Sequence, residues 1–340
     1  MPRVRDFLTI GALPAGPHSA ITDVPGVRVG HVSLREGDLR TGVTAVVPHG
    51  GNLYRRKVTA AAAVLNGYGK SAGLMQIEEL GSVESPILLT STLNVPRVAD
   101  ALITYMIGQD PEIGVNETVN PVVLECFDGY LSDARARAVG EDHVLAAVAA
   151  AQEGPVEVGC VGAGVGMRCL GFKSGVGGAS RVLAEPGFRL GVLVVPNFGF
   201  PGDLVVDGVA VGRELTAVAQ PSERGSCVFV VATDAPLSAL DLRRIAWRCF
   251  MGMARTGAIS GHTSGDLAVA FSTNPRQEPQ QRNTLNLLFR AAVEASEEAI
   301  LDALFAAETT TGRHGHVMPA LPISETIEIL KRHQTPGVRT

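Results

Sequence analysis

The sequence predicts one layered α/β domain, with helices packed on both faces of the β-sheet structure. Short runs rich in Val, Leu and Ala are typical of buried strands, and several longer stretches place apolar residues at helical spacing. Strands and helices are mixed along the chain instead of alternating strictly, which predicts layers of sheet and helix. No internal repeat, low-complexity tract or Pro/Ser-rich linker divides the 340 residues, so we expect a single domain over residues 1–340.

The expected strands fall into two kinds. The first two alternate turn residues with Val, which indicates short strands joined by Gly and Pro turns. The later ones are continuous apolar runs, which are typical of strands buried on both faces of a covered sheet. The expected strands lie at residues 21–31, 41–48, 86–90, 121–125, 191–196, 227–233 and 267–271.

Four helices are expected in addition to these strands. Residues 237–253 place Leu, Ile, Cys, Phe and Met on one face and Arg elsewhere, which predicts an amphipathic helix that covers the core. Residues 95–107 and 285–308 show the same spacing, and a last helix is expected after Pro322. The tail from Thr335 is expected to fray.

Composition and charge exclude several classes of protein. Hydrophobic residues make up 46% of the chain and charged residues 19%, as in a packed globular protein. The net charge is -5, the pI is about 5.9 and the basic residues are scattered, so nucleic acid is not expected as a partner. No run of about 18 apolar residues occurs, and the N-terminal segment lacks the apolar core of a secretory signal, so no membrane partner is expected.

Neither a metal nor an organic cofactor is expected. The five cysteines include no CxxC pair, which indicates neither a disulfide framework nor a zinc site and favours a reducing cytoplasm. His314 and His316 stand in a Gly-rich turn without nearby Cys, which predicts a solvated loop. The glycines of residues 159–167 follow a GxGxG spacing and run into further glycines, so they do not predict a nicotinamide site. They favour close backbone approach instead.

The dipeptide Gly225-Ser226 stands immediately before the expected strand 227–233. In a self-cleaving hydrolase, a Ser hydroxyl attacks the carbonyl just before it and an N-to-O acyl shift breaks the chain. The new terminal amine then serves as the base for the same hydroxyl. A Gly-Ser pair is also a common turn, so the residues by themselves leave both interpretations open.

Five further residues have a structural and a catalytic interpretation. Asn197 follows a buried strand, where its amide either caps a turn or donates a hydrogen bond to an oxyanion. A half-buried Tyr130 hydroxyl is also able to donate to an oxyanion. Ser264 and Asp266 are two apart on an extended segment, so they project to one side and are able to hold a free α-amine. Lys173 is an ordinary surface lysine or a cation that lowers the pKa of that amine.

Taken together, these segments resemble the self-processing β-peptidyl aminopeptidase family, which includes the L-aminopeptidase/D-amidases and, more remotely, the nylon-oligomer hydrolases. The resemblance spans nearly the whole chain, and its motifs occur in the expected order. They are ITDVPGVRVGH (21–31), TGVTAV (41–46), LTSTLNV (89–95), the Gly-rich stretch 162–178, NFG (197–199), VVATDAPL (230–237), ARTG (254–257) and SGD (264–266).

The resemblance implies a four-layer αββα sandwich of the N-terminal-nucleophile hydrolase kind. It implies a precursor cleaved between Gly225 and Ser226 into a long α part, residues 1–225, and a short β part, residues 226–340. Ser226 then matches the nucleophile.

The resemblance also implies roles for the surrounding residues. Asn197 and Tyr130 would serve the oxyanion, Ser264 and Asp266 would support the amine of the nucleophile, and Glu125 would anchor the N-terminal ammonium of the substrate.

Three further features of the chain bear on substrate and assembly. Lys173 matches a lysine that is functional in the nylon-oligomer branch. Cys126 and Phe127 stand where members of the family tend to be more polar, so Phe127 is expected to narrow the pocket near Glu125. Relatives of this kind usually form tetramers, which implies a homotetramer of αβ units.

The expected function is therefore that of a self-cleaving serine aminopeptidase or amidase. It would remove small N-terminal residues from peptides or amides through an acyl-enzyme on Ser226, without metal or cofactor. Two alternatives remain at this point: an acyltransferase of the ornithine acetyltransferase kind, and an uncleaved, non-catalytic binding protein.

Overall fold

The computed structural model describes residues 1–215 and 225–333. The tail from Thr335, which is expected to fray, lies outside this range. The strands are β1 (Arg28–Leu34), β2 (Thr41–Val47), β3 (Val58–Gly67), β4 (Ser82–Val83), β5 (Ile87–Ser91), β6 (Val122–Cys126), β7 (Arg168–Cys169), β8 (Phe172–Lys173), β9 (Gly177–Val182), β10 (Arg189–Asn197), β11 (Ser226–Thr233), β12 (Gly265–Ser272), β13 (Thr310–Thr311) and β14 (Val317–Met318). The α-helices are α1 (Leu74–Leu80), α2 (Val95–Gln109), α3 (Glu141–Ala149), α4 (Ala239–Arg255), α5 (Arg282–Phe305) and α6 (Ile323–His333).

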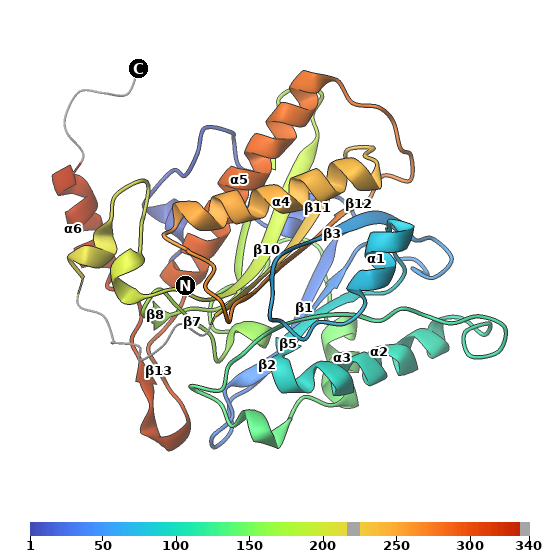
Figure 1. Cartoon of the computed structure of the whole chain (residues 1–340), viewed down its shortest axis with the longest axis horizontal. Helices are drawn as coiled ribbons and strands as arrows, with labels where there is room; N and C mark the ends of the chain where they lie inside the picture. Colours follow the sequence, from blue (N-terminus) through green and yellow to red (C-terminus); the bar gives the residue numbers. More distant parts are fainter. Residues whose placement is uncertain (216–224, 334–340) are drawn as a thin grey trace.

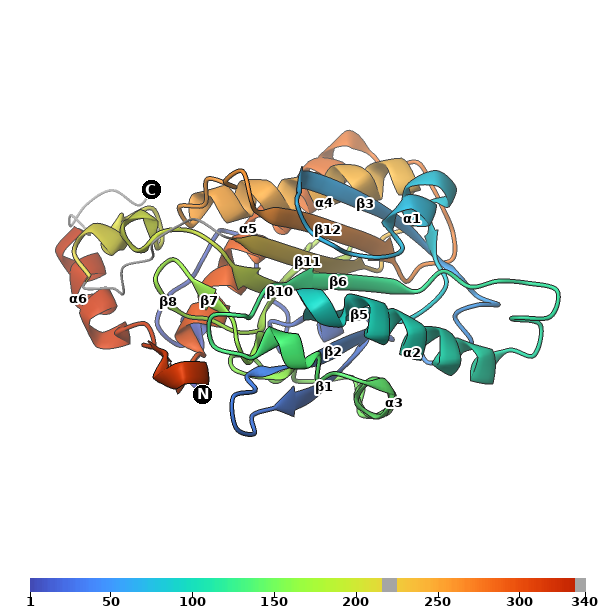
Figure 2. The ribbon, with the colours of Figure 1, turned by 60° about the horizontal axis from the view of Figure 1, so that its bottom comes forward.

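Two sheets stack at the centre of the molecule (Figure 2). In the described part of the chain, the smaller sheet has the order β1-β2-β5-β6 and the larger one has the order β4-β3-β12-β11-β10-β9. The pairs β5–β6 and β11–β12 are parallel, and the other pairs within these two sheets are antiparallel. Apolar side chains such as Leu124, Val195 and Val228 fill the space between the sheets.

Helices cover the outer face of each sheet (Figure 1). Ile245 of α4 and Ala295 of α5 belong to the core that includes Ala268 of the larger sheet. Leu102 of α2 packs in the core that includes Val43 of the smaller sheet. The predicted four-layer αββα sandwich is confirmed, and the layers form because each sheet buries apolar side chains on both of its faces.

The expected helices are found close to their expected bounds, but some elements were not expected from the sequence. The segment 21–31 begins with a 3₁₀ turn, and strand β1 starts only at Arg28. Strand β3 is rich in Ala, which has little intrinsic preference for strands, and it forms because it pairs with β12 and packs under α4. Strand β9, which begins with two glycines, and the short helices α1 and α3 were also not expected.

No helix in residues 1–215 and 225–333 combines the length and the apolar character that a membrane span requires.

Candidate active site

Strand pairing places Ser226 between the candidate residue Asn197 and the glycine of the SGD motif. Ser226 is the first residue of β11, where it lies opposite Asn197 of antiparallel β10 and beside Gly265 of parallel β12. Residues directly opposite each other in an antiparallel pair project to the same face of the sheet. By the alternation of the strand, this is the face that carries Val228 into the core between the sheets. The Asn197 amide therefore lies next to the Ser226 hydroxyl.

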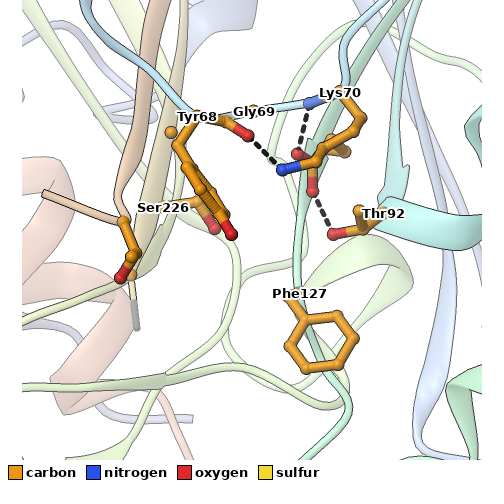
Figure 3. Close-up of a pocket in the computed structure, with 10 residues that line it drawn as sticks. Tyr68, Gly69, Lys70, Thr92, Phe127 and Ser226 are labelled. Atoms are coloured by element: carbon orange, nitrogen blue, oxygen red, sulfur yellow. Dashed lines mark hydrogen bonds between the residues drawn. The ribbon is translucent and has the colours of Figure 1, made fainter. Parts of the chain in front are cut away.

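A cavity of about 380 Å³ opens beside Ser226 (Figure 3). Ser226 is 3% exposed, and its Oγ makes no hydrogen bond to another described residue. Leaving a buried hydroxyl unpaired costs free energy, so native proteins leave few of them. The hydroxyl is available to a group that enters the cavity. The cavity is lined by Tyr68, Gly69, Lys70, Thr92, Glu125, Phe127, Gly225, Ser226, Thr263 and Gly265.

Cys126 does not compete with Ser226 as a nucleophile. Its thiol is buried and donates a hydrogen bond to the Val195 carbonyl, 3.1 Å away. Burial raises the pKa of the Cys126 thiol well above its usual value. Because the thiolate is the reactive form, a thiol held in its protonated form is inert.

The Asn197 side chain is held in one orientation by two backbone groups. Its Oδ1 accepts a hydrogen bond from the Arg168 N–H at 3.1 Å, and its Nδ2 donates to the Phe127 carbonyl at 3.0 Å. The second N–H of Nδ2 has no acceptor in the described part of the chain. A fixed amide with one free N–H beside the nucleophile is suited to stabilise an oxyanion.

Ser264 and Asp266 form a hydrogen-bonded pair at the start of β12. The Ser264 Oγ donates to Asp266 Oδ1 at 2.8 Å, and the Ser260 hydroxyl donates to Asp266 Oδ2. Both residues of the pair are buried. A Cβ on Gly225 would lie 3.1 Å from Ser264 Oγ, so this hydroxyl is next to the peptide bond that precedes Ser226. The sequence-based expectation that the two side chains project to one side is confirmed.

Glu125 brings a buried negative charge to the cavity wall. It stands near the end of β6 with 3% of its surface exposed. Its Oε1 accepts a hydrogen bond from the Lys70 backbone N–H at 2.8 Å, and its Oε2 accepts one from the Thr92 hydroxyl (Figure 3). No ion pair joins Glu125 to a Lys, Arg or His of residues 1–215 or 225–333. A buried carboxylate that lacks a cation suits a ligand that brings an ammonium group.

Aromatic side chains and one lysine shape the rest of the wall. Phe127 lines the cavity that Glu125 also lines, as expected, and remains 44% exposed. Lys70 places its Nζ 3.7 Å from the centre of the Tyr68 ring and donates to the Tyr68 carbonyl (Figure 3). The wall thus combines one carboxylate, one ammonium and two aromatic rings.

Asn197, Ser264 and Asp266 adjoin Ser226 or Gly225 without lining the cavity, and Tyr130 and Lys173 do not line it either. The Tyr130 ring stacks on His316 at 4.7 Å, and the Arg168 guanidinium lies over the ring at 4.3 Å. Lys173 is fully buried in β8, where its Nζ donates to the carbonyls of Gly164, at 3.2 Å, and of Ser174. Burial lowers the pKa of Lys173. Tyr130 and Lys173 thus make their described contacts away from the cavity lining, and their catalytic roles stay predictions, while His316 packs on the Tyr130 ring instead of being fully solvated.

Several residues of the cavity wall were not singled out from the sequence. Tyr68 and Lys70 follow the Ala-rich strand β3, which was itself not expected. The sequence Gly67-Tyr68-Gly69-Lys70 could have indicated these two residues, because glycines around an aromatic residue and a lysine mark a turn with exposed functional groups. Thr263 lies one residue before the SGD motif.

No group of three or more His, Cys, Asp or Glu side chains in the described ranges is placed to hold a metal ion.

Comparison with known proteins shows that the chain is similar to peptidases. The model of a family described as Peptidase family S58 matches residues 19–318. The chain is 38% identical to beta-peptidyl aminopeptidase BapA of Sphingosinicella microcystinivorans, a match that covers 98% of this chain and 93% of the relative.

Solved structures show the same fold over the whole chain. The PH0078 protein of Pyrococcus horikoshii OT3 superposes with a TM-score of 0.93 at 42% identity, covering 98% of this chain and 100% of that one. An L-aminopeptidase D-Ala-esterase/amidase from Ochrobactrum anthropi superposes with a TM-score of 0.88 at 32% identity, covering 98% and 99%. That structure is described as a prototype for the serine aminopeptidases and as a variant of the Ntn hydrolase fold.

Proposed function

The chain belongs to peptidase family S58 and is an aminopeptidase that hydrolyses peptide or amide bonds, and we propose that Ser226 is its nucleophile. The observation that carries the proposal is the buried Ser226 Oγ, which is unpaired within the described residues, on a residue that lines the cavity and lies opposite Asn197 in the sheet. We further propose that this residue becomes the N-terminus of a β chain, residues 226–340, when the precursor cleaves itself after Gly225.

Self-cleavage uses the groups around the bond between Gly225 and Ser226. The Ser226 Oγ attacks the Gly225 carbonyl carbon, the bond from that carbon to the Ser226 nitrogen breaks, and the nitrogen takes up the proton that the hydroxyl loses. Water then hydrolyses the ester, which leaves a carboxylate on Gly225 and a free amine and hydroxyl on Ser226. The Ser264–Asp266 pair, next to this bond, holds the new amine so that it accepts the proton of its own hydroxyl.

Turnover of a substrate repeats the same chemistry. Glu125 binds the N-terminal ammonium, Ser226 attacks the carbonyl of the first residue, and Asn197 donates its free N–H to the oxyanion. The leaving amine takes the proton, and water releases the acyl group from Ser226. A cavity of about 380 Å³ suits a small N-terminal residue, and the similarity to beta-peptidyl aminopeptidases supports β-amino acid residues among the substrates.

Intact mass spectrometry and denaturing gels of purified protein test the proposal. We expect two fragments from the wild-type chain, with the break after Gly225, and one band near 35.5 kDa without aminopeptidase activity from Ser226→Ala. Ser272→Ala, which removes a buried hydroxyl at the far end of the neighbouring strand β12, is the matched control and should cleave and turn over normally. A Ser226→Ala chain that still breaks into two fragments, or that still hydrolyses substrate, would rule out the assignment.

The two alternative functions are not favoured by the family match. An acyltransferase would release an acylated amine where the aminopeptidase releases a free amino acid, so product analysis separates them. A binding protein would remain a single uncleaved chain.

We also propose a homotetramer of αβ units in the cytoplasm. Large apolar side chains such as Met75, Leu80 and Leu240 are more than half exposed, which supports burial between subunits. The five cysteines are free and buried, which fits a reducing compartment. Light scattering on the purified protein measures the subunit number directly.

A further inference from the structure

The amide of Asn197 can donate to an oxyanion in only one of its two orientations. An asparagine amide has an oxygen on one side and an NH₂ group on the other, and a half-turn exchanges them. In the orientation of this structure, the Arg168 N–H donates to Oδ1 at 3.1 Å, and Nδ2 donates to the Phe127 carbonyl at 3.0 Å. After a half-turn, both contacts would be repulsive and an oxygen would replace the free N–H. The orientation of the amide therefore depends on where these two backbone groups are held.

Asp128 joins the two segments that carry these backbone groups. It directly follows Phe127 in the chain and is 1% exposed. Gly166, two residues before Arg168, packs against it, because a Cβ on Gly166 would lie 2.7 Å from the Asp128 Cβ. Asp128 therefore sets the spacing between the segment of the Phe127 carbonyl and the segment of the Arg168 N–H.

Three hydrogen bonds fix Asp128 in this place. Its Oδ1 accepts one from the Ser91 hydroxyl at 2.7 Å, at the end of β5. Its backbone carbonyl accepts one each from the N–H groups of Leu131 and Ser132, both at 3.0 Å, which closes the turn after β6. Ser91 pairs with Cys126 across the parallel strands β5 and β6, so the side-chain anchor is part of the smaller sheet.

The carboxyl group of Asp128 is costly where it stands. Its Oδ2 is buried and accepts no hydrogen bond from a described residue. Asp128 also takes part in no ion pair within residues 1–215 and 225–333. A buried oxygen without a partner lowers stability, and an apolar side chain of similar size would avoid this cost. Packing alone therefore does not account for an aspartate at this position.

Resting on the proposed function, we propose that Asp128 is a positioning residue for the oxyanion amide. Asp128 does not line the cavity, so it acts through the Phe127 carbonyl and the Arg168 N–H that together orient Asn197. Glu125 has its own hydrogen bonds and does not need Asp128 to bind the substrate ammonium. Loss of Asp128 should therefore slow the chemical step and leave substrate binding intact.

Substitution of Asp128 tests the proposal through the split between kcat and KM. In Asp128→Ala the turn loses its anchor, and kcat should fall about 10- to 100-fold, as expected for a misplaced group. KM should stay within about threefold of the wild-type value. Asp128→Asn keeps an oxygen that accepts from the Ser91 hydroxyl, so it should retain most of kcat. An unchanged kcat in Asp128→Ala, a loss confined to KM, or an equal loss in Asp128→Asn would overturn the proposal.

A double-mutant cycle separates positioning from a general structural role. In the Asn197→Ala background no amide is left to position, so the addition of Asp128→Ala should change kcat by less than about threefold. Two losses that multiply would show that Asp128 acts independently of Asn197 and would overturn the proposal. Each kcat is referred to the fraction of chains cleaved after Gly225, measured on denaturing gels.

A second variant keeps the proposal testable if Asp128→Ala folds poorly. Ser91→Ala removes the hydrogen bond to Asp128 Oδ1 and leaves the aspartate in place. It should lower kcat at least about threefold with KM unchanged. An unchanged kcat in Ser91→Ala would contradict the proposal.

Asp110→Ala is the matched control for the truncation of a buried carboxylate. Asp110 is 3% exposed, but it follows the far end of α2, where it pairs with Arg55. The variant should lose stability and keep the wild-type kcat. A loss of kcat as large as that of Asp128→Ala would show that the effect is not specific to Asp128 and would count against the proposal.

These outcomes are separable from failure of the proposed function. If Asn197→Ala keeps the wild-type kcat, the amide is not the oxyanion donor, and the inference falls with that part of the proposed function. If Asn197→Ala is slow while Asp128→Ala is unaffected, or while the two losses multiply, only the inference fails.

Discussion

Replacement of Glu125 by Gln isolates the contribution of one negative charge to substrate binding. The carboxylate accepts one hydrogen bond on each oxygen, from the Lys70 N–H and from the Thr92 hydroxyl, and it has no cation partner within the described residues. In Glu125→Gln the amide oxygen still accepts from the Lys70 N–H, and the Thr92 hydroxyl rotates to accept from the new amide N–H. The local packing is therefore preserved while the charge is lost.

The size of the effect follows from the bond that disappears. A hydrogen bond to a charged group contributes about 1.5–3 kcal/mol. Since 1.36 kcal/mol corresponds to a factor of ten, kcat/KM for an N-terminal ammonium substrate should fall by about 10- to 150-fold. Self-cleavage should be unaffected, because Gly225 is joined to the preceding chain and carries no free ammonium.

The assay compares two substrates that differ only in the terminal group, which is a charged ammonium in one and a neutral hydroxyl in the other. Steady-state hydrolysis of β-alanine p-nitroanilide should lose the full factor in Glu125→Gln, whereas the neutral 3-hydroxypropanoyl p-nitroanilide should react equally with both proteins. Thr92→Val, which removes one hydrogen bond and keeps the charge, is the control for local disturbance. An equal loss on both substrates, or a loss of less than threefold on the charged one, would refute the role of Glu125 as the ammonium anchor.

Two further perturbations test the oxyanion donor and a buried carboxyl group. Asn197→Ala should lower kcat by about 10²- to 10³-fold while the protein stays folded, and an unchanged kcat would exclude the amide as an oxyanion donor. Burial raises the pKa of Asp128 to about 6, from an ordinary value of 3.8. Below pH 4 this group is protonated in both the folded and the unfolded chain. Between pH 4 and 6 only the folded chain holds the proton, so stability falls as the pH rises and the loss is complete above pH 6. Relative to Asp128→Asn, whose side chain does not titrate, the wild type should lose about 3 kcal/mol of unfolding free energy from pH 4 to 7.5 in urea titrations. Parallel pH profiles of the two proteins would contradict this.

The sequence does not predict which aromatic residues form the wall of the cavity. Phe127 and Tyr130 are aromatic residues three positions apart after the same strand, and the sequence offers no local pattern that separates them. In the structure Phe127 lines the cavity, while Tyr130 stacks on His316, a residue 186 positions away. The choice depends on a contact between distant segments, which periodicity and spacing do not encode.

The positions of Lys173 and Lys70 relative to the cavity likewise could not be predicted from the sequence. The sequence drew attention to Lys173, which lies in a Gly-rich run, yet its ammonium is satisfied by two carbonyls away from the cavity wall. Lys70 lines the cavity only because the end of β3 comes to lie beside Glu125 of the other sheet, where its N–H is bonded to that carboxylate.

The sequence by itself determined the elements that depend on neighbouring residues: most of the buried strands, the amphipathic helices, a strand that starts next to Ser226, and the shared side of Ser264 and Asp266. These follow from the alternation of a strand and the period of a helix, which act over a few residues. Only the tertiary structure decided that Asn197, Ser226 and Gly265 stand side by side and that Glu125 faces the same cavity. The reason is that the pairing of β10 with β11 and of β11 with β12, and the stacking of the two sheets, join segments far apart in the chain.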